Sequence, residues 1–200
     1  MNTTVAWILA AVIGYLLCSV STGILYSRSM GRDIRTQGSK NSGATNMTRV
    51  HGIKSGALTF LGDCAKGVIA ALIGKLLGGQ TGAIIGGTAA VIGHTWPVFF
   101  GFKGGKGVAT CMGVGMFTFP PFGVGAIAIG AAVMLISRYV SLGSMVGMAV
   151  FGVAMTIRYG FWPLGLWACA LAGLVIWRHR GNIQRLLSHT EHKMGEHTDK

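Results

Sequence analysis

The stretch Val5-Ala-Trp-Ile-Leu-Ala-Ala-Val-Ile-Gly-Tyr-Leu-Leu-Cys-Ser-Val-Ser-Thr-Gly-Ile-Leu-Tyr26 contains no charged side chain. A helix that crosses a bilayer needs ~20 mostly apolar residues, and this run is long enough to supply them. Asn2 and Thr3 precede the run, without the basic segment that opens a signal peptide. We therefore expect the run to be a retained membrane anchor.

Similar apolar runs recur along the rest of the chain. Hydrophobic residues make up 51% of the sequence, charged residues only 11%, and the mean hydropathy is +0.57. The Pro120-Pro121 pair separates two of the runs, because proline disfavours helix in the residue before it. The pattern predicts an all-α polytopic membrane protein with about seven transmembrane helices, as one domain over residues 1–200 with a polar, frayed tail from about residue 188. The six further runs are Gly56–Leu77, Thr81–Pro97, Val108–Phe119, Phe122–Ile136, Leu142–Ile157 and Phe161–Trp177.

The distribution of basic residues predicts the orientation in the membrane. The net charge is +12, but the cations gather in short connecting segments, as expected of the positive-inside rule and contact with anionic lipid rather than of nucleic-acid binding. Seven spans with the N-terminus outside place only Lys75 and Arg158 in outer segments and put the C-terminus in the cytoplasm. The inner cations are then Arg28, Arg32, Arg35, Lys40, Arg49, Lys54, Lys103, Lys106, Arg138, Arg178, Arg180, Arg185, Lys193 and Lys200.

Two glycine-rich polar segments on the predicted inner face favour phosphate binding. Gln37–Arg49 mixes hydroxyl and amide side chains with glycines, so its N–H groups and hydroxyls could face an anion, although it could equally be an ordinary loop before a helix. Gly93–Gly107 contains Gly104-Gly-Lys-Gly107, with Lys106 at the start of a predicted helix. This is not a Walker loop, because no Ser or Thr follows the lysine.

Three ionisable residues lie within or at the ends of apolar runs. Asp63 and Lys66 are three residues apart, so they share a helix face and should pair. The pair could fix helix packing or support a site. His94 could transfer a proton, but a histidine at a helix end is more often a hydrogen-bonded strut.

Two later segments add donors to the same predicted face. Ser137–Ser144 is a helix-start signal that carries hydroxyls at Ser141 and Ser144. Trp177–Leu187 is rich in arginine, which alone would only set the topology, but His179 and Asn182 add specific donors.

The chain has little material for several common chemistries. Outside the tail, Asp33 and Asp63 are the only acidic residues, which disfavours a carboxylate-driven hydrolase or a two-metal site. The four cysteines are scattered, so we expect neither a disulfide framework nor a zinc site, and we expect no cofactor. Five polar segments together predict a membrane-embedded site for one or more phosphates. They are Gln37–Arg49, Gly62–Gly67, Gly93–Gly107, Ser137–Ser144 and Trp177–Leu187.

Taken in order, these segments resemble the bacterial acyl-phosphate:glycerol-3-phosphate acyltransferase family, small integral membrane enzymes of phospholipid synthesis. The matching residues are Gly38-Ser-Lys-Asn-Ser-Gly-Ala-Thr-Asn46 with Arg49, Asp63-Cys-Ala-Lys-Gly67, Gly93-His-Thr-Trp-Pro97 with Gly104–Thr110, Tyr139–Ser144 and Arg178-His-Arg-Gly-Asn-Ile-Gln-Arg185. The family's first motif often has Gly and Pro where this chain has Lys40 and Ser42.

The resemblance implies the reaction and the partners. Acyl phosphate would donate its acyl group to the 1-hydroxyl of glycerol-3-phosphate, giving lysophosphatidic acid and phosphate, at the cytoplasmic side of a bacterial inner membrane. Catalysis would be substrate-assisted, with a phosphate oxygen taking the hydroxyl proton and the protein supplying position and charge. The partners would be these two substrates and membrane lipids, without nucleic acid or metal.

The resemblance also implies roles for individual residues. Ser39, Arg49, Lys106, His179 and Asn182 would hold glycerol-3-phosphate and serve catalysis. Further substrate contacts would come from Thr45, Asn46, Gly104, Gly105, Ser141 and Ser144, with Thr45, Gly105, Ser144 and Asn182 near the acyl phosphate. Asp63, Lys66 and His94 would support the site.

Two other functions fit part of the sequence. A carrier or channel for a phosphorylated metabolite would also use a cationic, glycine-rich site, but it needs a polar path across the membrane, and Thr81–Pro97 and Phe122–Ile136 offer little. A non-catalytic binder of acidic headgroups would explain the basic loops, but not Asp63, Ser144 or the Gly-Gly-Lys-Gly turn.

Overall fold

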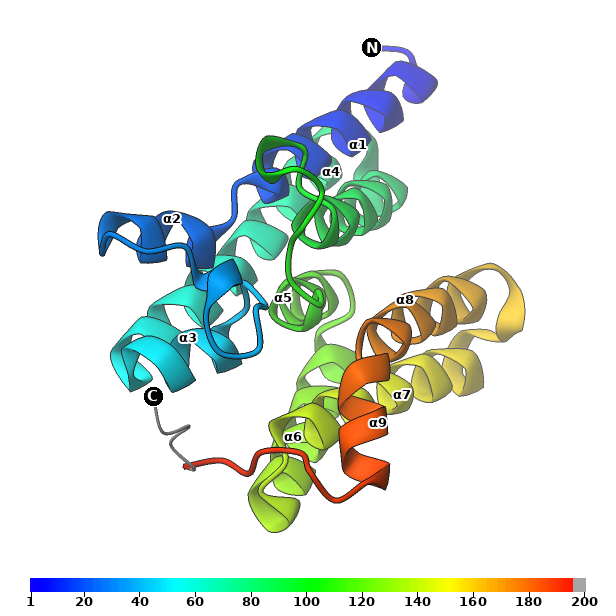
Figure 1. The fold of residues 1–200 in the computed structure, drawn as a ribbon. Helices are drawn as coiled ribbons and strands as arrows, with labels where there is room; N and C mark the ends of the chain where they lie inside the picture. Colours follow the sequence, from blue (N-terminus) through cyan, green and yellow to red (C-terminus); the bar gives the residue numbers. More distant parts are fainter. Residues whose placement is uncertain (196–200) are drawn as a thin grey trace. The chain divides into compact units, whose positions relative to one another are not determined.

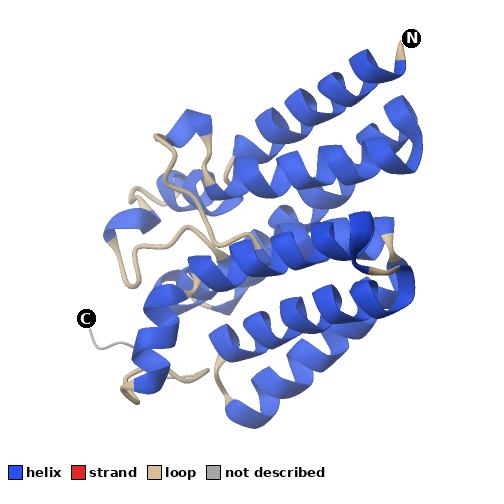
Figure 2. Ribbon diagram, turned by 90° about the vertical axis from the view of Figure 1, so that its right-hand side faces the viewer, coloured by secondary structure: helices blue, strands red, loops and turns tan. Residues whose placement is uncertain are grey.

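The computed structural model describes residues 1–195, and in that part of the chain helices and loops account for all of the structure (Figure 2). The elements form two compact units, the first from Met1 to Thr118 and the second from Phe119 onward. The helices and helical turns are α1 (Thr3–Ser19), α2 (Thr22–Ser29), η1 (Ile34–Thr36), α3 (Ala44–His51), α4 (Ile53–Thr95), η2 (Val98–Phe100), α5 (Val108–Thr118), α6 (Pro120–Ser137), α7 (Val140–Tyr159), η3 (Phe161–Gly165), α8 (Leu166–Arg178) and α9 (Arg180–Leu187).

In the first unit, α1 packs along α4, and α4 also contacts α3 and α5 (Figure 1). The long α4 is broken at Gly78 and Gly79, whose backbone angles are not helical. The two limbs fold back on each other so closely that a Cβ atom at Gly74 would clash with the carbonyl oxygen of Gly82. The break lies in the gap that the sequence leaves between two predicted spans, and glycine there lets the backbone turn and approach itself.

The first predicted span differs from the structure. We expected one helix over Val5–Tyr26, but α1 ends at Ser19 and α2 begins at Thr22, with Val20 extended between them. The break frees the carbonyl oxygen of Val20, which accepts a hydrogen bond of 3.1 Å from Lys66 Nζ on α4. A contact between distant parts of the chain thus stabilises a break that hydropathy does not reveal.

The proline pair acts as expected. Helix α5 ends at Thr118, and α6 starts with Pro120 and Pro121 in its first turn, where proline needs no intrahelical N–H bond. Helix α5 has only 11 residues, or ~16 Å of length, against ~30 Å of bilayer hydrocarbon. It is therefore too short to cross the full hydrocarbon thickness as a straight helix.

In the second unit, α7 packs between α6 and α8, and α9 follows α8 after a short turn at His179 (Figure 1). Small residues allow the contact between α6 and α7, since a Cβ atom at Gly143 would clash with the carbonyl oxygen of Gly130. Close approach of this kind is typical of helices packed in lipid.

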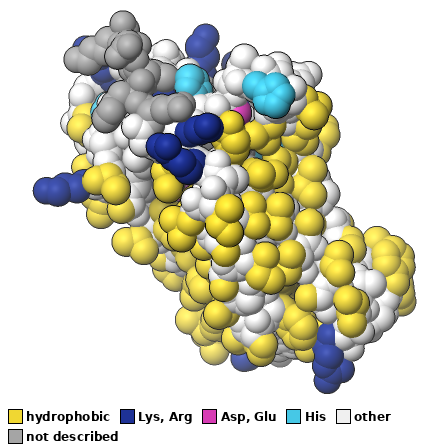
Figure 3. Space-filling view, turned by 90° about the horizontal axis from the view of Figure 1, so that it is seen from below, with side chains coloured by type: hydrophobic (Ala, Val, Ile, Leu, Met, Phe, Trp, Pro, Cys, Tyr) yellow, Lys and Arg dark blue, Asp and Glu magenta, His cyan; other side chains and the backbone are white. Residues whose placement is uncertain are grey.

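The surface supports an integral membrane protein. Large apolar side chains are exposed, among them Ile136 at 86% and Leu76 at 78%, and hydrophobic atoms cover much of the face in Figure 3. Within the described residues, five helical segments are long and apolar enough to cross a bilayer, and the shorter Val108–Thr118 is apolar too. The number of crossings, the orientation of the termini and the single domain stay predictions. The five segments are Thr3–Ser29, Ile53–Phe100, Pro120–Ser137, Val140–Tyr159 and Phe161–Arg178.

Candidate active site

The loop before α3 is shaped by the buried side chain of Asn46. Its Oδ1 accepts a 2.9 Å hydrogen bond from the Ser39 N–H. Its Nδ2 lies 3.0 Å from the carbonyl oxygen of Gln37 and 2.9 Å from that of Asn41. Gly38 has a φ of 53° and packs against this amide, so a side chain there would collide with it. Asn46 therefore holds the loop in one conformation by replacing missing backbone hydrogen bonds.

This loop and the helix α3 that follows it carry three residues predicted to bind substrate. Ser39 and Thr45 are exposed, and Arg49 is half-buried. Thr45 and Arg49 lie four residues apart on α3, so they share one face of that helix. The fold thus leaves a hydroxyl and a guanidinium on one side of a short helix.

Asp63, Lys66 and His94 form a buried polar cluster that joins the two limbs of α4. Lys66 Nζ lies 2.8 Å from Asp63 Oδ1, as the three-residue spacing predicts, and His94 Nδ1 lies 3.5 Å from the same oxygen. Asp63 is 1% exposed and Lys66 7%. Buried charges of this kind are tolerated when they are paired, and removing one partner leaves the other uncompensated.

The Gly-Gly-Lys-Gly loop is attached to the end of α4. The N–H groups of Gly104 and Gly105 donate to the carbonyl oxygens of Thr95 and His94, at 3.3 and 3.2 Å. Both glycines are buried, and a Cβ atom at Gly105 would clash with His94 Nε2. The end of α4 therefore uses both N–H groups, and contact of Gly104 and Gly105 with substrate stays a prediction.

Lys106 follows directly and is half-buried, whereas Lys103 on the same loop is exposed. Gly107 has a φ of 87°, and α5 begins at the next residue, as the sequence predicts. Because His94 packs against Gly105, the position of Lys106 depends on the buried cluster of Asp63, Lys66 and His94.

In the second unit, a carboxylate gathers several of the predicted donors. Glu191 Oε1 accepts hydrogen bonds from Ser141 Oγ at 2.8 Å and from Asn182 Nδ2 at 2.6 Å, and Glu191 Oε2 accepts one from Arg185 Nε at 2.7 Å. Burial raises the pKa of Glu191, but these hydrogen bonds and the charge of Arg185 outweigh it and hold the pKa below its usual range. Glu191 is therefore ionised at neutral pH and joins the start of α7 to α9.

Sequence reasoning missed Glu191 because it treated the tail from residue 188 as frayed. That expectation is wrong for Glu191 and for Met194, whose N–H donates to the carbonyl oxygen of Arg138 at 2.7 Å. The available signal was a single acid close behind a cluster of arginines. Residues 196–200, including the predicted inner cation Lys200, lie outside the described residues.

The other predicted residues of the second unit, His179 and Ser144, bind backbone oxygens one helical turn earlier. His179 is buried, and its Nδ1 lies 2.8 Å from the carbonyl oxygen of Val175, which orients the ring. Ser144 Oγ donates to the carbonyl oxygen of Val140 within α7. Ser141, Ser144, His179 and Asn182 thus belong to the second unit, and the other ten predicted site residues belong to the first.

Comparisons with known proteins agree with the motifs. A family model described as glycerol-3-phosphate acyltransferase matches residues 8–189. A glycerol-3-phosphate acyltransferase from Thermoanaerobacter sp. (strain X514) is 46% identical over 193 residues, which cover 96% of this chain and 98% of the relative. One from Clostridioides difficile (strain 630) is 42% identical over 201 residues, covering 96% of this chain and 97% of that protein.

Solved structures give the same result. The crystal structure of PlsY (YgiH), an integral membrane glycerol 3-phosphate acyltransferase, in its glycerol 3-phosphate form superposes with a TM-score of 0.87 at 38% identity, covering 94% of this chain and 96% of that chain. Its lysophosphatidic acid form gives a TM-score of 0.84. The resemblance inferred from the motifs is confirmed: the chain belongs to the glycerol-3-phosphate acyltransferase family and is an integral membrane enzyme.

Proposed function

We propose that the acyl donor is acyl phosphate and that the acceptor is the 1-hydroxyl of glycerol-3-phosphate. The hydroxyl oxygen bonds to the acyl carbon, the bond from that carbon to the phosphate oxygen breaks, and the departing phosphate takes the hydroxyl proton. The products are 1-acylglycerol-3-phosphate and inorganic phosphate. The solved relative's glycerol 3-phosphate and lysophosphatidic acid forms support this acceptor and product.

The observation that carries this proposal is that every carboxylate in residues 1–195 is already in an ion pair. Asp33 binds Arg35, Asp63 binds Lys66, and Glu191 binds Arg185. A carboxylate held by a cation is a weak proton acceptor, because the cation stabilises its charged form. A donor whose leaving group is itself a base needs no such residue, and acyl phosphate is a donor of that kind.

The proposed binding roles are those that the family resemblance implies. Ser39, Arg49 and Lys106 supply donors and cations for glycerol-3-phosphate in the first unit, and His179 and Asn182 supply donors in the second. Thr45, Gly105, Ser144 and Asn182 would lie near the acyl phosphate, and Ser141 would add a further substrate contact. Asn46, Gly104 and Gly105 also shape their loops, because their polar groups bind the backbone. Asp63, Lys66 and His94 support the loop of Lys106.

The decisive experiment measures phosphate release by purified protein in detergent. Palmitoyl phosphate is supplied with and without glycerol-3-phosphate, and palmitoyl-CoA serves as the control donor. Release that needs both substrates, with one lysophosphatidic acid formed per phosphate, supports the proposal. Turnover with palmitoyl-CoA and none with palmitoyl phosphate would overturn the donor, and no turnover in protein that binds glycerol-3-phosphate would favour a carrier.

Two matched lysines test the assignment of the loop. Lys106→Ala should lower turnover by about 10²-fold or more, since it removes a cation that we propose holds the phosphate of glycerol-3-phosphate in place. Lys103→Ala removes an equal charge from an exposed position three residues earlier and should act nearly as wild type. A folded Lys106→Ala enzyme at full rate would contradict the role of Lys106.

We further propose that the enzyme lies in the bacterial cytoplasmic membrane with this loop facing the cytoplasm. The clustering of cations in the segments that carry the site residues supports this orientation. A membrane-impermeant thiol reagent should label Lys103→Cys in inside-out vesicles only. Labelling in right-side-out vesicles would reverse the orientation.

A further inference from the structure

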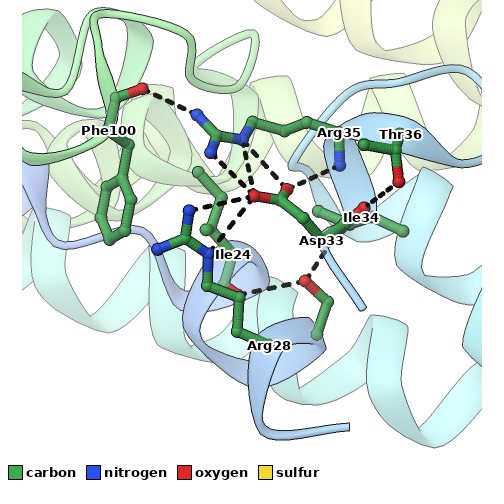
Figure 4. Close-up of polar contacts among 8 residues, drawn as sticks. Ile24, Arg28, Asp33, Ile34, Arg35, Thr36 and Phe100 are labelled. Carbon is green, nitrogen blue, oxygen red and sulfur yellow. Dashed lines mark hydrogen bonds and ion pairs between the residues drawn. The ribbon is translucent and has the colours of Figure 1, made fainter. Parts of the chain in front are cut away.

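A charged cluster precedes the first site loop. Asp33 caps η1, and its carboxylate is bound by two guanidinium groups (Figure 4). Arg35 Nη2 lies 2.8 Å and Arg28 Nη2 3.2 Å from Asp33 Oδ2. The hydrogen bond from the Arg35 side chain is the largest cause that holds the pKa of Asp33 well below its usual range. The carboxylate therefore stays charged at any pH at which the enzyme works.

Among the hydrogen bonds drawn in Figure 4, only Arg35 connects the Asp33 carboxylate to the backbone of a distant segment. Arg35 Nη1 donates to the carbonyl oxygen of Phe100 at 2.7 Å. Arg28 lies over the Phe100 ring, 5.5 Å from its centroid, as Arg35 does at 6.0 Å. Asp33 fixes the Arg35 guanidinium from one side, and the rigid fork of that group points its other nitrogen at Phe100.

The two ends of this connection belong to different site loops. Arg35 lies in η1, directly before the loop that leads to Ser39 and Arg49. Phe100 ends η2, directly before the loop that leads to Lys106. Apolar contacts reinforce the connection, because the Phe100 side chain packs against a buried cluster of Ile24, Ile34 and Met47, of which Met47 lies on α3 with Arg49.

We propose that Arg35 is a positioning residue that sets the separation between α3, which carries Arg49, and the loop of Lys106, through its hydrogen bond to the Phe100 carbonyl. This inference rests on the proposed function, in which both cations bind glycerol-3-phosphate. Arg49 and Lys106 carry like charges, which disfavours bringing them together before substrate binds. A contact outside the substrate site is therefore needed to hold α3 and the loop of Lys106 in place. Misplacement of such groups by about 1 Å can cost as much as 10²-fold in activity.

The test compares Arg35→Lys with Arg28→Lys. Both substitutions keep the charge and a partner for Asp33, but a lysine at position 35 has a single nitrogen and cannot bind Asp33 and the Phe100 carbonyl in the forked manner of arginine. Arg35→Lys should raise the KM for glycerol-3-phosphate by about 10-fold or more while kcat at saturation stays within a few fold, because bound substrate itself draws the loops together. Arg28→Lys should match wild type.

Three results would overturn the inference. The first is an unchanged KM in folded Arg35→Lys protein. The second is an equal effect of Arg28→Lys, which would mean that the guanidinium contacts around Asp33 matter in general rather than the bond from Arg35 to Phe100. The third is a loss of kcat and melting temperature together with no separate change in KM, which would indicate a merely structural role.

Calorimetric titration with glycerol-3-phosphate separates this inference from the choice of donor. The affinity of wild type, Arg28→Lys and Arg35→Lys for glycerol-3-phosphate can be measured without any acyl donor. If palmitoyl phosphate fails as a donor but Arg35→Lys still binds glycerol-3-phosphate about 10-fold more weakly, the positioning role stands and only the donor is wrong. If the donor works and the affinity does not change, the positioning role fails.

Discussion

Replacing Glu191 with glutamine should loosen the second unit without changing the shape of the side chain. The carboxylate accepts three hydrogen bonds of 2.6, 2.7 and 2.8 Å, which join α7 to α9. In Glu191→Gln the remaining oxygen can still accept from Ser141 and Asn182, but the bonds are no longer charge-assisted. The new amide group also faces Arg185, a donor against a donor.

The size of the effect follows from these contacts. A hydrogen bond to a charged group contributes about 2 kcal/mol and a neutral one about 1, so weakening two of them costs roughly 2 kcal/mol. The Arg185 side chain is 40% exposed, so its ion pair adds no more than about 1 kcal/mol. The free energy of unfolding should therefore fall by about 2–3 kcal/mol, and the melting temperature by roughly 5–10 °C for a chain of this length.

The assay is thermal unfolding of purified protein in one detergent, followed by helical circular dichroism. Ser188→Ala is the matched control, because this exposed hydroxyl donates only to backbone within the last turn of α9 and contacts Thr190. It should melt within about 1–2 °C of wild type. If Glu191→Gln melts with Ser188→Ala, the carboxylate does not hold the tail against α7 and the reasoning is refuted.

Three further substitutions test the first unit. Gly105→Ala should cost about 1–3 kcal/mol and raise the KM for glycerol-3-phosphate, since its methyl group would displace either His94 or the loop of Lys106; unchanged kinetics and melting would contradict the packing described here. Asp63→Asn should destabilise by about 3–5 kcal/mol because it leaves Lys66 charged and buried, and adding Lys66→Met should restore much of the melting temperature, a recovery that a purely packing effect would not give. Because the folded pKa of Asp33 is lowered, its stabilising effect is fully present above the ordinary carboxyl pKa of about 4 and is lost only as the pH falls through the lowered value. The difference in melting temperature between wild type and Asp33→Asn should therefore stay constant from pH 8 to pH 5 and become smaller below about pH 4. A difference that also stays constant below about pH 4 would show that the pKa of Asp33 is the same in the folded and the unfolded chain.

The structural features that the sequence predicted correctly are those that depend on residues close together in the chain. The spacing of Asp63 and Lys66 predicted their ion pair, and Pro120 marked the start of α6, because both effects act within a single turn of helix. The end of α1 at Ser19 was missed because it is stabilised by Lys66, which is far away in the sequence. Periodicity and hydropathy carry no information about such a contact.

In the candidate site, too, local features could be predicted and contacts between distant segments could not. The residue types that suit a phosphate could be read from composition and order, but the direction of each backbone N–H could not. Gly104 and Gly105 looked available to a ligand, and the structure uses both to bind the end of α4. Glu191 was missed for a related reason, since its three partners come from α7 and α9 and only the folded chain brings them to it.

The hairpin of α4 has a consequence for how the chain enters the membrane during synthesis. Asp63 lies on the first limb and His94 on the second, and Lys66 is one turn from Asp63, so the charged groups neutralise one another within a single continuous segment. Inserting an isolated Asp or Lys at the centre of a helix costs about 2.5–3.5 kcal/mol each. If the two limbs insert together as a preformed hairpin, most of that cost is offset before any later helix has been made. The buried cluster that supports the loop of Lys106 would then form during synthesis, before the later helices that complete the site are made.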